Sequence, residues 1–173
     1  MIQLQKRKRQ IEFFPIFKKL LNKDKNLLLI LVGSGILLNY AKKKAQELKI
    51  KENVLFVGFS KFPEKYIALA DLCVMNSIRE GLPRVVPQYI AAGKPVITSN
   101  LPGIEEIIKN SINGFIFHQD NQIELYKKLY LTLSNKKTLK KITIGAKKTD
   151  ISKWSHLLMP VKIDKLYDDL LKC

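Results

Sequence analysis

The sequence predicts an α/β fold in which a doubly wound parallel sheet is flanked by helices. Short apolar runs that suit buried strands alternate along the chain with longer segments that suit helices. The first of these runs, 27–32, reads LLLILV, the unbroken apolar pattern of a central parallel strand. The stretch 72–98 then reads as a complete strand–helix–strand unit, which is the building block of parallel sheets.

The predicted elements follow one another in a regular order. Apolar runs predict strands at 27–32, 53–57, 72–75, 96–98 and 115–117. Helices are expected at 11–21, 36–48, 61–70, 83–92 and 136–148. A further helix, capped by Asn121, carries apolar residues as far as Leu133. The last helical region, 152–171, is interrupted at Pro160, and we expect Trp154 and Tyr167 to pack there.

Polar groups suited to a phosphorylated sugar gather where the helix after the third strand begins. Pro83 fits the first helical position, which leaves the backbone amides of Arg84 and Val85 free to bind phosphate. Glu80 stands just before this helix, and Gln88 shares a helical face with Arg84. The set suits a sugar, a diphosphate and a ribose. On residue types alone, a solvated first turn, with an acidic residue favoured by the helix dipole, is the preferred interpretation.

The order of residues in this region resembles the donor-binding signature of the family-4, or group 1, glycosyltransferases. The matching residues are EGLP at 80–83, Gln88, AAGKPVI at 91–97, Gly103 and EE at 105–106. The members of this family are retaining, nucleotide-sugar-dependent enzymes of the GT-B fold. The resemblance covers roughly 8–170 and implies that the chain is one Rossmann-like, nucleotide-sugar-binding domain over 1–173, with C-terminal helices at about 152–173.

The resemblance also implies roles for individual residues. Glu80 becomes the catalytic residue that contacts the donor sugar. The residues implied to follow the sugar and diphosphate are Gly81, Leu82, Arg84 and Val85. Gln88 stands where the family has a second Glu that holds the ribose hydroxyls. A Gln can still accept a hydrogen bond from one hydroxyl, but it lacks the charge that strengthens a carboxylate contact.

Two further parts of the donor site are implied near the start of the chain. The turn containing Gly33 and Gly35 matches a VGxG turn that faces the donor in the family, although a tight turn with close helix packing is an open alternative. Lys8 is near the position of a diphosphate-binding Lys. The family's Arg before it is missing, because Gln3 and Leu4 occur there. The residues that we expect could substitute are Lys6, Arg7 and Arg9, and a solvated basic tail is the alternative.

Composition narrows the class of partner. The formal net charge of +16 comes mostly from Lys, with four Arg, and no nucleic-acid motif is recognised, so we do not expect nucleic acid as a partner. A Lys-rich surface suits anionic headgroups at the inner membrane face. No run reaches a membrane span, and no signal segment is recognised, which predicts a cytoplasmic protein. Neither the histidines (His118, His156) nor the cysteines (Cys73, Cys173) have metal-ligand spacing, and no DxD occurs, so we expect no metal and no cofactor.

The resemblance extends to the C-terminal half of the family and implies that the N-terminal acceptor domain is absent. We therefore expect a donor-binding half that uses a UDP- or GDP-sugar, with a saccharide or lipid-linked acceptor, and that transfers sugar poorly without a separate N-terminal chain. Two alternatives stay open at this point. One is a non-catalytic nucleotide-sugar-binding or scaffold module, and the other is a basic nucleic-acid or membrane-surface binder, which predicts steep salt dependence.

Overall fold

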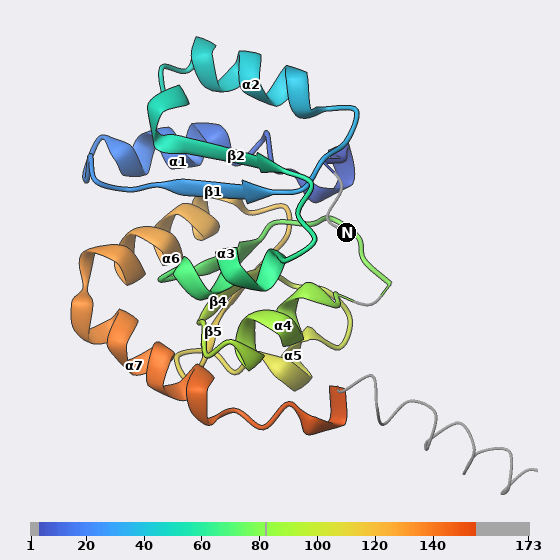
Figure 1. Cartoon of the computed structure of the whole chain (residues 1–173). Helices are drawn as coiled ribbons and strands as arrows, with labels where there is room; N and C mark the ends of the chain where they lie inside the picture. The colour runs from blue at the N-terminus through green and yellow to red at the C-terminus, as the bar shows by residue number, and fades with distance from the viewer. Residues whose placement is uncertain (1–3, 82, 155–173) are drawn as a thin grey trace, which may run out of the picture.

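The computed structural model describes residues 4–81 and 83–154 and confirms an α/β fold with parallel strands and flanking helices (Figure 1). The strands are β1 (Leu29–Val32), β2 (Val54–Gly58), β3 (Cys73–Met75), β4 (Val96–Ser99) and β5 (Gly114–Phe117). The helices are α1 (Phe14–Leu21), α2 (Leu38–Glu47), α3 (Pro63–Leu69), α4 (Val85–Ala91), α5 (Ile104–Ile107), α6 (Gln122–Ser134) and α7 (Lys136–Lys148). Three 3-10 turns complete the order: η1 (Lys6–Lys8), η2 (Lys51–Asn53) and η3 (Ser152–Trp154).

The strands form two parallel sheets. One sheet has the order β1-β2, and the other has the order β3-β4-β5. The prediction of a central strand at 27–32 is therefore wrong, because β1 has one strand neighbour within the described residues. All four of its residues are half-buried. An unbroken apolar run indicates that a strand is covered by helices on both faces of its sheet. It does not indicate how many strands pair with that strand.

One hydrophobic core joins the two sheets. Helices α1 and α6 supply Phe14, Phe17, Leu125 and Leu129, against which side chains from both β1 and β3 pack. A second core lies on the other face of the three-stranded sheet, where α4 and α5 cover it. The three-stranded sheet is thus covered by helices on both faces, as a doubly wound fold requires.

Several helix ends differ from the prediction. Helix α4 begins at Val85 with Arg84 as its N-cap, so Pro87 occupies the third helical position. There its missing N–H removes no helical hydrogen bond, because the first amides of a helix have no partner within it. Helix α5 was not predicted. The expected contact of Trp154 with Tyr167 lies outside the described residues. Among the described helices, none is long and apolar enough to cross a membrane.

Candidate functional site

The carboxyl ends of the strands meet at one edge of the molecule and are tied together by hydrogen bonds. The Gly33 amide donates to the Gly58 carbonyl at 2.7 Å, which joins the ends of β1 and β2. The Ser99 hydroxyl donates to the Ser77 carbonyl at 2.6 Å, which joins the ends of β4 and β3. In open α/β sheets, ligands bind in the crevice at this edge.

The first residues of the chain bridge the two sheets at the same edge. The Leu4 amide donates to the Ser34 carbonyl at 2.9 Å, just beyond β1. The Arg7 carbonyl accepts from the Ile78 amide at 2.8 Å, just beyond β3. The turn η1 lies between these contacts, and its Lys8 side chain lines the cavity at this edge.

Lys8 and Glu80 form an ion pair at the mouth of this crevice. The Lys8 Nζ lies 3.2 Å from Glu80 Oε1, and the two side chains are 20% and 13% exposed. The Ser77 hydroxyl donates to the same carboxylate oxygen at 3.1 Å. The ammonium and the hydroxyl together fix the position of Glu80 Oε1. The other oxygen of this carboxylate, Oε2, makes no hydrogen bond within the described residues. The pair thus places one acceptor and one cation side by side.

The other basic residues near the N-terminus do not reach Glu80. Arg9 has a left-handed backbone conformation, and its guanidinium contacts the Gln119 carbonyl and Asp120. Arg7 donates to the Gln5 side chain at 2.8 Å in an exposed position, and Lys6 is exposed. Lys8 lines the cavity, whereas the three residues that the sequence offered in place of the missing Arg (Lys6, Arg7 and Arg9) do not.

The start of α4 faces the same region. The Val86 amide donates to the Pro83 carbonyl at 2.9 Å. The amides of Arg84 and Val85 have no acceptor among the described residues. Gln88 lies one turn further along this helix and is exposed. A cavity of about 550 Å³ is lined by these predicted site residues: Lys8, Gly33, Glu80, Val85 and Gln88.

The remaining predicted site residues lie elsewhere. A Cβ on Gly35 would stand 2.8 Å from the Leu4 carbonyl oxygen, so this glycine permits close approach of the N-terminal chain and is not part of the cavity lining. Gly81 is exposed with open space around its Cα, and Arg84 is exposed. Leu82 lies outside the described residues.

Sequence reasoning missed two polar residues at this edge. Ser77 is buried and fixes Glu80, and Asn76 is buried and exchanges hydrogen bonds of 3.3 Å with the Gln122 side chain. Both directly follow the apolar run 72–75. Polar residues placed immediately after a buried parallel strand are the signal that identifies them.

The titratable groups beside the cavity are not arranged as a metal site. Within residues 4–81 and 83–154, no group of three His, Cys, Asp or Glu side chains could hold a metal ion. Burial raises the pKa of the Cys73 thiol to about 12, opposed weakly by Lys94. This thiol therefore stays protonated and behaves as a small apolar group. His118 is exposed, and its amide donates to Glu124.

Residues 1–149 match the model of the glycosyl transferases group 1 family. The chain belongs to this family. It is 30% identical over 138 residues to an uncharacterized glycosyltransferase from Haemophilus influenzae, covering 74% of this chain and 39% of the relative. It is 24% identical over 143 residues to a UDP-Gal:alpha-D-GlcNAc-diphosphoundecaprenol alpha-1,3-galactosyltransferase from Escherichia coli, covering 82% of this chain and 37% of the relative.

Solved structures of GT-B glycosyltransferases share the fold. A TarM variant from S. aureus, in complex with fondaparinux, alpha-GlcNAc-glycerol and UDP, superposes with a TM-score of 0.86 at 19% identity. The match covers 95% of this chain and 34% of that protein. The group 1 chain described here thus spans between a third and two fifths of the length of these relatives.

Proposed function

We propose that this group 1 chain is the donor-binding half of a retaining glycosyltransferase that uses a UDP- or GDP-sugar. The observation that carries the proposal is the Lys8–Glu80 pair beside the cavity that Gln88 also lines. Family membership supports the reaction class. The UDP in the TarM complex and the UDP-Gal in the name of the Escherichia coli relative support a nucleotide-sugar donor.

In the proposed reaction, the bond from the anomeric carbon to the diphosphate breaks, and its electron pair leaves with the diphosphate oxygen. The acceptor oxygen bonds to the same carbon on the same face, and its proton passes to the departing diphosphate oxygen. Lys8 and the free amides of Arg84 and Val85 stabilise the negative charge that builds on the leaving group, and no metal is needed. Glu80 accepts hydrogen bonds from the sugar hydroxyls, and Gln88 accepts one from the ribose.

The acceptor side is proposed to be formed by a part of the enzyme that these 173 residues do not include. The chain spans a minor part of its relatives' length, and the proposed cavity is lined by donor-side residues. A saccharide or a lipid-linked sugar is the proposed acceptor, in keeping with the diphosphoundecaprenol in the name of one relative. The net charge of +16 favours contact with anionic headgroups at the inner membrane face, where a lipid-linked acceptor would be met.

Calorimetric titration of the purified chain with UDP, GDP and ADP, followed by their sugar forms, tests the proposal. We expect saturable binding of one nucleotide, with tighter binding of its sugar form that Glu80→Ala abolishes. Glu12→Ala is the matched control, because Glu12 is exposed and does not line the cavity. Folding of each variant is checked by circular dichroism. Equal binding of all three nucleotides, or of none, would overturn the assignment.

A further inference from the structure

The exposed face of α7 is a continuous basic surface. The helix reads KKTLKKITIGAKK, with six lysines and no acidic residue, and its buried side chains, Ile142 and Ala146, belong to the two hydrophobic cores. All six lysines are exposed. At about 100° per residue, they fall within one arc of about 140°, opposite the buried stripe. We call this arc the lysine face; it consists of Lys136, Lys137, Lys140, Lys141, Lys147, Lys148 and the exposed Ile144.

Ile144 stands at the middle of the lysine face. Its side chain is 44% exposed. It follows Lys140 by one helical turn and precedes Lys148 by one turn, so the three side chains share one side of the helix. An exposed aliphatic side chain surrounded by ammonium groups suits a surface that carries negative headgroups above an apolar layer.

The charge of the lysine face is not balanced within residues 4–81 and 83–154. The ion pairs in that part of the chain involve other basic residues. The acidic residue nearest to the end of the helix, Asp150, accepts hydrogen bonds from Ser152 instead. The basic helix α2 differs, because it contains an acid of its own, Glu47, which pairs with Lys44 at 2.9 Å. The lysine face is thus available to an anionic partner.

The same arrangement disfavours the helix in the absence of a partner. Lys136 and Lys140 are four residues apart, as are Lys137 and Lys141, and like charges at this spacing repel each other. The first turn contains two of these lysines and no acidic residue, although the helix dipole favours negative charge there. An anionic surface over the helix would neutralise both unfavourable contributions. The pattern therefore indicates that such a surface is the partner.

The chemistry of the face favours lipid headgroups over nucleic acid. All of its cations are lysines, whereas arginine provides the bidentate contacts that read base edges and phosphates in a fixed geometry. An ammonium is a hydrated point charge that needs no fixed partner geometry, which suits headgroups that move within a bilayer. The central Ile144 also has a place to go at a bilayer, because it can enter the boundary between headgroups and acyl chains.

We propose that the lysine face of α7 is the surface by which the chain docks on a bilayer that contains anionic phospholipid. The membrane as a partner rests on the proposed function, whereas the choice of α7 rests on the lysine face. The helix would lie in the plane of the headgroups. Its lysine stems would extend along the surface to the phosphates, and Ile144 would point toward the acyl chains.

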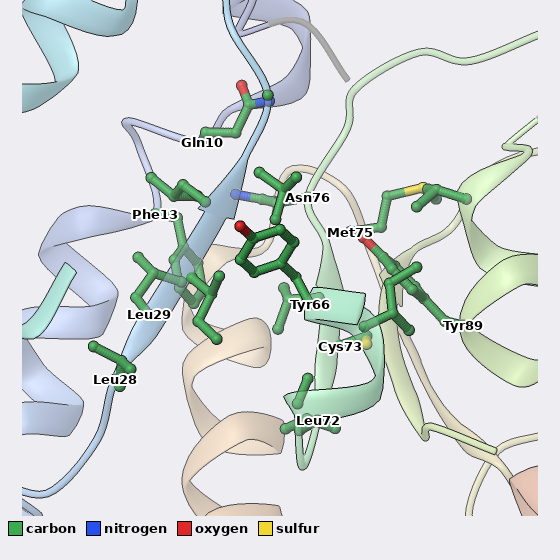
Figure 2. A pocket seen from close by; sticks show the side chains of 18 of the residues that line it. Gln10, Phe13, Leu28, Leu29, Tyr66, Leu72, Cys73, Met75, Asn76 and Tyr89 are labelled. Carbon is green, nitrogen blue, oxygen red and sulfur yellow. The ribbon is translucent and has the colours of Figure 1, made fainter. Parts of the chain in front are cut away.

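Docking through α7 would leave the proposed donor site open. No residue of α7 lines the cavity beside that site, and Figure 2 shows the side chains that do. Helix α7 packs against α4, whose first residues face the cavity. Docking would therefore hold the cavity at a height above the bilayer that α4 and α7 determine, beside a membrane in which a lipid-linked acceptor would also be held.

Co-sedimentation of the full chain with lipid vesicles tests the proposal. The vesicles contain phosphatidylglycerol and phosphatidylcholine in equal parts, and vesicles of phosphatidylcholine alone are the reference. We expect saturable binding to the anionic vesicles that weakens steeply as NaCl is added, because salt screens the attraction. Combining Lys137→Gln, Lys140→Gln and Lys141→Gln is expected to weaken this binding about tenfold or more, since each lysine near an anionic surface strengthens it about fivefold.

A second triple variant is the matched control. Lys42→Gln, Lys43→Gln and Lys51→Gln remove the same charge from exposed lysines on and beside α2, which Figure 1 shows on the opposite side of the molecule from α7. Equal weakening by the two triple variants would show that net charge alone drives binding and would overturn the proposal. Failure of the unaltered chain to bind anionic vesicles would also overturn it, as would tighter binding to duplex DNA or RNA.

A fluorescence measurement tests the place of Ile144. With Trp154→Phe as background, Ile144→Trp is expected to show a blue-shifted emission on anionic vesicles and quenching by brominated acyl chains. Tyr40→Trp, at an exposed site on α2, is the control. Equal shifts at the two sites, or none at position 144, would contradict the proposal. Nucleotide titration of the α7 triple variant is run separately and is expected to match the unaltered chain, so failure of donor binding is distinguished from failure of docking.

Discussion

The ammonium group of Lys8 lies 3.2 Å from the carboxylate of Glu80, joining the first turn of the chain to the loop after β3. Each residue belongs to a segment that is fixed by backbone hydrogen bonds, through Leu4 and Arg7 on one side and Ile78 on the other. The pair is thus positioned before any ligand binds. A diphosphate entering the crevice would meet a cation that is already oriented, which lowers the cost of binding.

Replacing Lys8 is expected to weaken nucleotide binding. Lys8→Met removes the cation and keeps most of the stem. We expect UDP or GDP affinity to fall about tenfold or more, because hydrogen bonds to charged groups contribute about 1.5–3 kcal/mol. Lys6→Met is the control, since Lys6 is exposed and does not contact Glu80. Calorimetry on both variants measures the difference, and an unchanged affinity in Lys8→Met would remove this residue from the donor site.

The cap of α6 should contribute measurably to stability. The Asn121 side chain accepts a hydrogen bond from the Glu124 amide at 2.9 Å, which confirms the predicted cap. Asn121→Ala should lower the free energy of unfolding by about 1 kcal/mol, and Asn121→Ser should retain most of it. Urea denaturation of the three proteins measures this. Equal losses in the Ala and Ser variants would show that the cap hydrogen bond is not the cause.

A glycine within α7 is expected to resist replacement. A Cβ on Gly145 would collide with the Ile112 carbonyl. Gly145→Ala should therefore lower the free energy of unfolding by about 1–3 kcal/mol, although alanine is the better helix former. Ala146, its neighbour, is already buried. Ile144→Ala, at a partly exposed site of the same helix, is the matched control. A stabilised Gly145→Ala protein would show that α7 can move away from Ile112.

Local patterns located most strands but not the relations between distant segments. The predicted strands 72–75, 96–98 and 115–117 agree within one residue with β3, β4 and β5, because their apolar runs are bounded by turn-forming residues. The divided sheet was missed, since hydrophobicity reports side-chain burial and not the number of strand neighbours. The need for Gly145 arises from Ile112, which lies on another segment and leaves no local signal.

The Cys73 thiol links stability to alkaline pH. Burial raises its pKa from 9.0 to about 12 in the folded chain. The contribution of the protonated thiol to stability is complete below pH 9.0 and is lost as the pH rises toward 12, because the unfolded chain releases this proton first. With Cys173→Ser as background, we expect the thiol to react with a disulfide reagent at pH 8 far more slowly in the folded chain than in urea. Cys73→Ala should flatten the alkaline part of the pH–stability curve, and an unchanged curve would contradict the link.

Placing a carboxylate at position 88, where this chain has Gln88, is expected to strengthen donor binding. Gln88 is exposed on α4 and lines the cavity that Lys8 and Glu80 share. A carboxylate accepts stronger, charge-assisted hydrogen bonds from the two ribose hydroxyls than a neutral amide does. Gln88→Glu should therefore raise nucleotide affinity by about three- to tenfold, the ratio expected when a neutral hydrogen bond becomes a charged one. Gln88→Ala should lower it, and Gln46→Glu on the exposed surface of α2 is the control for added charge. If Gln88→Glu and Gln46→Glu change the affinity equally, the effect is one of net charge, and Gln88 does not contact the ribose.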